Sequence, residues 1–291
     1  MSEKLQRHHY VPKFYLAHWC VKNEDLLLLH TKDEFGKVFI GKKSPYSVSY
    51  LRGLYTSSPE KHPFPTLPSN HIEDNFFKRL DNDASLIHKK LVESGVASLN
   101  SDERTIWSMF INSLLERGPV RINEVLEKAN AHTEELIQSM SNLLNSSPYG
   151  QPPPMSYIDI PALARNSVLT GMVHSICDHK TLEYFFNLRW TITHLTGGED
   201  HFLTGDCPVV INGGQSETYP IHVISIALSP NKLLIMHTDS DEFDEEIFVK
   251  LSMVHNPLIV EQTQKYLVSS RAMTDEGCIK NKRILDLMFK K

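Results

Sequence analysis

The chain has few cysteines and no long apolar run. Its four cysteines are widely separated and form no Cys-x-x-Cys pair. A cysteine zinc site and a disulfide framework are therefore not indicated, and reduced, mostly buried thiols are expected. No apolar run approaches the length of a membrane span, and residues 1–7 lack the apolar core of a signal peptide. We expect a soluble, cytoplasmic protein without a membrane partner.

The sequence also lacks an excess of positive charge. Its formal net charge is −5, which argues against binding nucleic acid mainly by electrostatics, although a local basic patch can coexist with a negative total. HExxH, GxSxG, P-loop and GxGxxG motifs are absent as well. Nothing therefore points to a zinc protease, a serine hydrolase, an NTPase or a dinucleotide enzyme.

The pattern of apolar residues predicts an α+β fold. Apolar residues make up 41% of the 291 residues, which is enough to bury a full core. Residues 1–69 are expected to hold an N-terminal motif and a β-hairpin around 26–40. Residues 70–146 are expected to be helical, and residues 157–291 to hold an antiparallel or mixed sheet with flanking helices. We expect a single large domain over 1–291.

Helical periodicity and turn residues set the expected elements. Asn70 with Glu73 has the spacing of a capping box, and the Ser101 hydroxyl is expected to cap the next helix. Residues 57–69 and 146–156, which are rich in proline, are expected to be loops. The expected helices cover residues 13–19, 70–93, 101–115, 121–145, 162–177, 241–254, 256–265 and 275–291. The expected strands cover 185–195, 202–211, 221–228, 233–237 and 266–270.

The N-terminal motif, residues 7–16, places Arg7, His8 and His9 directly before aromatic and apolar anchors. Two imidazoles offer four ring nitrogens that can donate, accept, bind metal or move protons near neutral pH. Pro12 disfavours helical geometry at Val11, so the histidines are expected on an extended segment before a short helix. We interpret the motif as one wall of a polar site. The alternative is an N-terminal arm docked on the core with exposed histidines.

Arg117 and Glu73 are the polar candidates of the helical region. Arg117 continues an apolar helical row just before Gly118–Pro119 breaks the helix. A buried arginine needs a partner. Arg117 therefore either pairs with acids of the fold or binds an anionic substrate through its planar fork. We favour a site role for Arg117 and a structural role for Arg121, whereas Glu73 is either a capping residue or a site residue.

Asp206 interrupts a strand-like apolar run. Gly205 allows close approach of another group, and Pro208 removes a ladder donor. Together they predict a strand end or bulge that displays Asp206 into a cleft. The alternative is an Asx-type turn, in which the Asp206 carboxylate only accepts backbone N–H groups. Cys207 has no base nearby in the sequence that would mark it as a nucleophile.

The N-terminal motif resembles HHYVPxFYLxxF/W, the opening signature of a widespread bacterial family catalogued as domain of unknown function four-two-three-eight. Further similarities follow in order and cover nearly the whole chain: Glu73 at a helix start, Leu115–Arg121 against xxRTPxxR, Phe202–Val209 against FxTSDxPV, Leu228–Pro230 against PLSP, and Asn256. The sequence departs from these patterns at Gly118, Gly205, Cys207 and Ala227. The resemblance implies a set of polar site positions and carries no activity with it.

These residues suggest a hydrolytic site. His8, His9, Arg117 and Asp206 are the expected catalytic residues, and His9, Glu73 and Asp206 could bind a divalent ion, Mg, Mn or Zn. One imidazole would act as general base, and Arg117 would stabilise an anionic transition state.

This inventory predicts a metal-assisted hydrolase that cleaves a phosphodiester, with nucleic acid or a phosphorylated small molecule as substrate. Association with similar families suggests a nuclease-like effector of bacterial conflict or antiviral defence. The alternative is a non-catalytic sensor or partner-binding protein, acting with a partner protein or a second copy, whose charged residues form a buried structural network.

Overall fold

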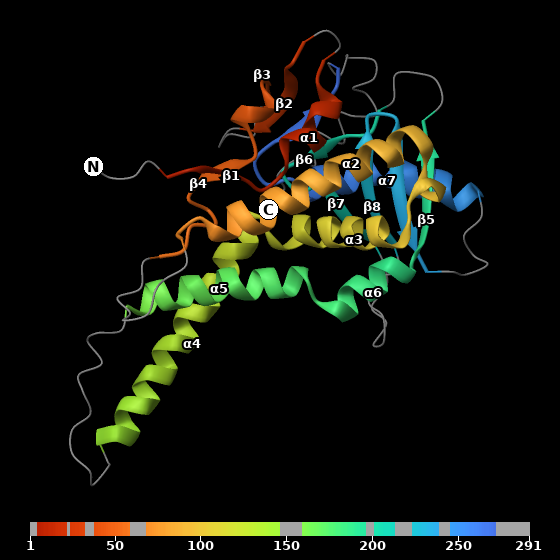
Figure 1. Ribbon diagram of the computed structural model, residues 1–291. Helices are drawn as coiled ribbons and strands as arrows, with labels where there is room; N and C mark the ends of the chain where they lie inside the picture. The colour runs from red at the N-terminus through yellow and green to blue at the C-terminus, as the bar shows by residue number, and fades with distance from the viewer. Residues whose placement is uncertain are drawn as a thin grey trace.

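A computed structural model describes residues 5–21, 24–32, 38–58, 68–145, 159–195, 201–212, 223–238 and 245–271. Helices and antiparallel sheets combine in an α+β fold, which confirms the predicted fold class (Figure 1). The expected loop at 146–156 and the expected helix at 275–291 lie outside the described residues. Within the described part of the chain, none of the helices combines the length and apolarity that a membrane span requires.

Helices dominate the middle of the chain, as predicted. Helix α3 contacts α2, α5 and α6, while α4 pairs with α5 and its far half extends beyond the rest of the molecule (Figure 1). The helices are α2 (Lys78–Ser94), preceded by a π-helical turn (Glu73–Phe77), α3 (Ser101–Glu116), α4 (Pro119–Asn145), α5 (Ile160–Ile176) and α6 (His179–Asn187).

The predicted Ser101 cap is wrong, and the capping box, one of the two roles left open for Glu73, is absent. Asn100, one residue before Ser101, caps α3, and it forms a reciprocal capping box with Glu103 at 2.9 and 3.0 Å. The Asn70–Glu73 capping box is absent because the Asn70 Oδ1 atom instead accepts the Thr56 hydroxyl at 2.9 Å. Glu73 is thereby released from a capping role.

The described strands form three sheets, and every strand pair in them is antiparallel. The first pairs β1 (Arg7–His9) with β4 (Tyr50–Arg52). The second has the order β3 (Val38–Lys43), β2 (Leu27–Lys32), β10 (Leu267–Ser269), β6 (Thr204–Gly205). The third has the order β5 (Arg189–His194), β9 (Lys232–His237), β8 (Val223–Ser229), β7 (Val209–Asn212). The predicted hairpin is confirmed as β2 and β3, and β10 extends it from the other end of the chain.

Three expectations for the last third need correction. Phe185 lies in α6, so the strand expected from residue 185 begins only at Arg189, because Asp178 caps a helix there by accepting the backbone N–H of Thr181. The strand expected over 202–211 is two strands in different sheets, since the chain turns at Asp206. The two helices expected over 241–265 are one helix, α7 (Glu245–Gln262), which contains Pro257.

The N-terminal motif is part of the main core. Tyr15, in α1 (Lys13–Leu16), donates its hydroxyl to the Ala227 carbonyl at 2.8 Å. Trp19, in the 3-10 turn Ala17–Trp19, donates its indole N–H to the Phe202 carbonyl at 2.9 Å. Both side chains are fully buried. Tyr15 therefore ties the motif to β8, and Trp19 ties the turn that follows it to the segment before β6, so the motif is not a loosely docked arm.

The cysteines are less buried than predicted. Cys177 is exposed, whereas Cys20 and Cys207 are half-buried, and no disulfide joins these three described cysteines. Cys177 follows the last residue of α5, where the helix ends at the surface. The expectation that the thiols are mostly buried therefore does not hold for these three cysteines.

Candidate functional site

The two histidines of β1 point to opposite sides, because side chains alternate along a strand. His8 is fully buried. Its Nδ1 atom accepts the backbone N–H of Tyr55 at 2.8 Å, and its ring stacks on the Tyr55 ring with centroids 5.3 Å apart. Burial lowers the pKa of His8 to about 4, against the opposing effect of Asp74. His8 is thus a neutral ring at pH 7 that holds the backbone after β4.

His9 lies within electrostatic range of several charged side chains. Burial lowers the pKa of His9 to about 4, and the charges of Lys13 and Arg117 lower it further. Arg117 also acts on the pKa values of Glu73 and Asp81, and Lys13 acts on that of Asp81. We call these five residues, His9, Lys13, Glu73, Asp81 and Arg117, the His9–Arg117 cluster.

Arg117 lies at the most buried point of the cluster, where α3 ends. Its side chain has 0% exposure. The Nη1 atom donates to Asp81 Oδ1 at 2.9 Å, and the guanidinium carbon lies 5.2 Å from the centre of the Phe77 ring. The Nε and Nη2 atoms are buried and have no hydrogen-bond partner. The ion pair with Asp81 thus leaves two of the three guanidinium nitrogens of Arg117 without a hydrogen-bond partner.

Glu73 enters the cluster from the π-helical turn that precedes α2. Such turns are found frequently at functional sites. The Glu73 Oε2 atom is buried without a partner. Burial raises the pKa of Glu73 to about 7; Asp81 adds to the increase and Arg117 opposes it. Near pH 7, protonated and ionised Glu73 are therefore present in similar amounts.

Asp81 and Lys13 were not predicted as site residues. Asp81 is 23% exposed and supplies the charge that pairs with Arg117. Burial raises the pKa of Asp81, whereas Arg117 lowers it. Lys13 is exposed, and its ammonium lies 4.4 Å from the centre of the Tyr46 ring. The helical repeat offered one signal, because Asp81 follows Glu73 by about two turns and falls on the same face.

Asp206 has a different environment. Its carboxylate accepts the backbone N–H groups of Gln264 at 3.0 Å and Lys265 at 2.5 Å, directly after α7. A Cβ atom at Gly205 would lie 2.9 Å from the Thr263 hydroxyl, so glycine permits this close approach. Burial raises the pKa of Asp206 to about 6, against the effect of these backbone hydrogen bonds. The Asp206 carboxylate thus accepts backbone N–H groups, as the alternative stated, but these belong to the distant segment after α7 and not to a local Asx turn.

The structure therefore groups the predicted site residues unevenly. His9 and Glu73 each lie within electrostatic range of Arg117. His8 points to the other side of β1, and no hydrogen bond or ion pair within the described residues joins Asp206 to the cluster. Among the described residues, no group of three or more His, Cys, Asp or Glu side chains is arranged to hold a metal ion.

A comparison with models of protein families matched residues 7–272 to the family described as Protein of unknown function (DUF4238). This match confirms the resemblance stated from the sequence. No curated protein and no solved structure matched the chain. The matched range contains the whole His9–Arg117 cluster, and the description of the family names no activity for it.

Proposed function

This chain belongs to the DUF4238 family, and we propose that its His9–Arg117 cluster hydrolyses a phosphodiester. One observation carries the proposal: of the buried side-chain atoms that lack a partner among the described residues, four belong to this one cluster, namely Arg117 Nε and Nη2, Glu73 Oε2 and His9 Nε2. Each unpaired buried polar group costs about 1–3 kcal/mol, so folded proteins keep few of them. A bound anion and an attacking water would supply the missing partners.

The unused donors of Arg117 favour an oxyanion. Nε and Nη2 form one edge of the guanidinium, and their parallel N–H bonds match two oxygens of a phosphate. The opposite side is already occupied, because Nη1 donates to Asp81. Arg117 is therefore held in place by Asp81 while its two-donor edge has no hydrogen-bond partner.

Glu73 has the properties of a general base. With a pKa of about 7, its ionised form can take a proton from water at neutral pH. The water oxygen then attacks phosphorus, the bond from phosphorus to the leaving oxygen breaks, and protonated Glu73 returns the proton to that oxygen. The negative charge on the phosphoryl oxygens is stabilised by Arg117. Neutral His9 orients the water through Nε2, and exposed Lys13 attracts the anionic substrate.

A divalent ion is an alternative form of the proposal, in which His9 and Glu73 would bind the ion instead of acting directly on the attacking water. Of the three predicted ligands, His9 and Glu73 lie in the cluster and have unpaired atoms. Mg²⁺, Mn²⁺ or Zn²⁺ bound there would polarise the phosphate and lower the pKa of a bound water. The proposed setting is a nuclease-like effector of bacterial conflict or antiviral defence.

A second candidate is a non-catalytic sensor or partner-binding protein. It is favoured by the complete burial of Arg117 and by its ion pair with Asp81, which are also features of a structural network. In this case the cluster would bind an anion, and no bond would be broken.

The deciding experiment measures turnover and binding on the same variants. Bis(p-nitrophenyl) phosphate and short RNA and DNA oligonucleotides are incubated with the full chain, with a chelator or with each of the three metals. We expect hydrolysis by the wild type and a loss of about 10²–10⁴-fold in Glu73→Gln. Glu124→Gln, an exposed change on α4, is the matched control and should keep full activity.

Calorimetry with inorganic phosphate separates the two candidates. Phosphate binding that Arg117→Lys weakens, without turnover of any ester, would favour the sensor. The absence of both binding and turnover would make the cluster a structural network and refute the proposed function.

A further inference from the structure

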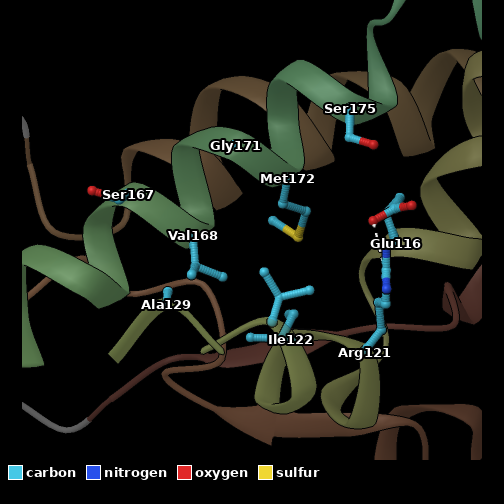
Figure 2. Close-up of a pocket in the computed structure, with 10 residues that line it drawn as sticks. Glu116, Arg121, Ile122, Ala129, Ser167, Val168, Gly171, Met172 and Ser175 are labelled. Carbon is cyan, nitrogen blue, oxygen red and sulfur yellow. Dashed lines mark hydrogen bonds and ion pairs between the residues drawn. The ribbon is translucent and has the colours of Figure 1, made fainter. Parts of the chain in front are cut away.

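A pocket of about 320 Å³ lies between α4, α5 and the end of α3 (Figure 2). Ile122, Val168 and Met172 form its apolar walls, while Glu116 and Arg121 lie together at one end. This volume is at the lower end of the range of about 300–1,000 Å³ that is typical of small-molecule sites. The pocket is separate from the His9–Arg117 cluster in its lining residues. It has an apolar body and one charged end.

The charged end carries one group of each sign. Arg121 Nε donates to Glu116 Oε2 at 3.4 Å, and the two side chains are 48% and 19% exposed. A long, partly exposed ion pair contributes little to stability, so a ligand can rearrange it at low cost. The pair uses only Nε of the guanidinium, which leaves the Nη groups for an anion.

Helix ends add the same pair of charges. Arg121 in the first turn of α4, Ser175 in the last turn of α5 and Glu116 at the end of α3 all line this pocket. A helix N-terminus favours anions and a helix C-terminus favours cations. Both a negative and a positive group are therefore favoured within one small region.

We propose that this pocket binds a zwitterion with an apolar side chain, of the class of the larger apolar α-amino acids. The carboxylate pairs with Arg121 at the start of α4, and the ammonium pairs with Glu116 near the end of α5. The side chain lies between Ile122, Val168 and Met172. A simple anion in this pocket would be repelled by Glu116, and a simple cation would be repelled by Arg121. An α-amino acid instead carries both a negative and a positive group on one carbon atom.

Gly171 gives the pocket its opening on α5. A Cβ atom at this position would meet nothing within 4 Å. Glycine within a helix costs roughly 0.5–1 kcal/mol relative to alanine, and no neighbouring atom requires it here. Because Gly171 lines the pocket and its Cβ position is open, we expect a longer side chain there to narrow the pocket and also to favour the helix.

Calorimetry on the full chain tests the proposal with L-leucine, L-methionine and L-phenylalanine as ligands. We expect saturable binding of at least one of them, with one molecule per chain. Leucinamide lacks the carboxylate and isocaproate lacks the ammonium, so both should bind at least about tenfold more weakly than leucine. Tenfold corresponds to about 1.4 kcal/mol.

Three variants locate the binding. Arg121→Gln and Glu116→Gln should each weaken it at least about tenfold, while Lys128→Gln, an exposed change on α4, should leave it unchanged. Gly171→Met should abolish it without lowering the melting temperature, and Gly171→Ala should raise the melting temperature.

The proposal is overturned by any of three results. These are no saturable binding of the three amino acids at millimolar concentrations, binding of isocaproate as tight as that of leucine, or binding that survives in both Arg121→Gln and Gly171→Met.

Discussion

Glu73 and Asp206 are two buried carboxyl groups with raised pKa values, and they differ in their hydrogen bonds. Burial raises the pKa of Glu73 to about 7 and that of Asp206 to about 6. Asp206 accepts two backbone N–H groups, whereas the Oε2 atom of Glu73 has no partner. A raised pKa therefore occurs both in a carboxyl group that holds the backbone and in a candidate catalytic one. The unpaired oxygen is what singles out Glu73.

The largest expected effect on stability is that of Asp206→Ala. Two part-buried backbone N–H groups after α7 would lose their charged acceptor, at about 1–2 kcal/mol each, so we expect roughly 2–4 kcal/mol of destabilisation in urea unfolding. Asp206→Asn keeps one oxygen acceptor and should cost less. A loss below about 0.5 kcal/mol for Asp206→Ala, the range of ordinary surface changes, would break the comparison with Glu73.

The same contrast applies to the histidines. His8→Ala removes the acceptor of the Tyr55 N–H and should cost roughly 1–3 kcal/mol. His9→Ala removes a half-buried ring whose Nε2 has no partner and whose hydrogen bond is to the backbone of Tyr46, and we expect it to cost less because His9 is less buried than His8. Chemical denaturation of both variants at pH 7 measures the difference. Equal losses of unfolding free energy would show that His9 stabilises the fold as much as His8 does.

Glu73→Gln should change how stability depends on pH. The pKa of Glu73 is about 7 in the folded chain and 4.5 as the ordinary value, so the folded state binds the proton more tightly. The stability from this group is fully present below about pH 4.5 and is lost as the pH rises through 7. Between pH 5 and pH 7 the wild type should lose roughly 1–2 kcal/mol relative to the variant. Parallel curves would contradict the raised pKa.

Lys13→Gln should have the smallest effect. Lys13 is exposed, so its replacement should change the free energy of unfolding by less than about 0.5 kcal/mol. Its charge contributes to the lowered pKa of His9, and that pKa should rise above about 4 in the variant. An NMR titration of the His9 ring measures the change. An unchanged value would remove Lys13 from the cluster.

Local patterns in the sequence predicted more than long-range ones. The periodic apolar residues of 101–115 located α3, and Gly118–Pro119 located the end of that helix. Phe185 was placed in a strand because an apolar, aromatic run does not distinguish a short helix from a strand. The Asn70 cap failed because Thr56, from another segment, took its acceptor. A hydrogen bond from a residue of another segment, such as Thr56, cannot be predicted from the local sequence pattern around Asn70.

The candidate site was predicted only in part for the same reason. The position of Arg117 in an apolar helical row predicted that its side chain needs a partner. The sequence did not predict that this partner is Asp81. His9 and His8 are adjacent in sequence, and only strand alternation in the folded chain separates their roles. The two backbone N–H groups that engage Asp206 come from Gln264 and Lys265, far along the chain. Such pairings depend on tertiary structure.

The pairing of β2 with β10 has a consequence for biosynthesis. Leu29 lies opposite Val268, so β2 waits for its partner until the ribosome has added the residues up to β10. At about 5–20 residues per second, this wait is on the order of ten seconds or more. During that time the edge of β2 and its buried leucines, Leu27 to Leu29, have no cover. An unfinished chain therefore carries an open, apolar strand edge, and this segment is where a nascent-chain chaperone should bind first.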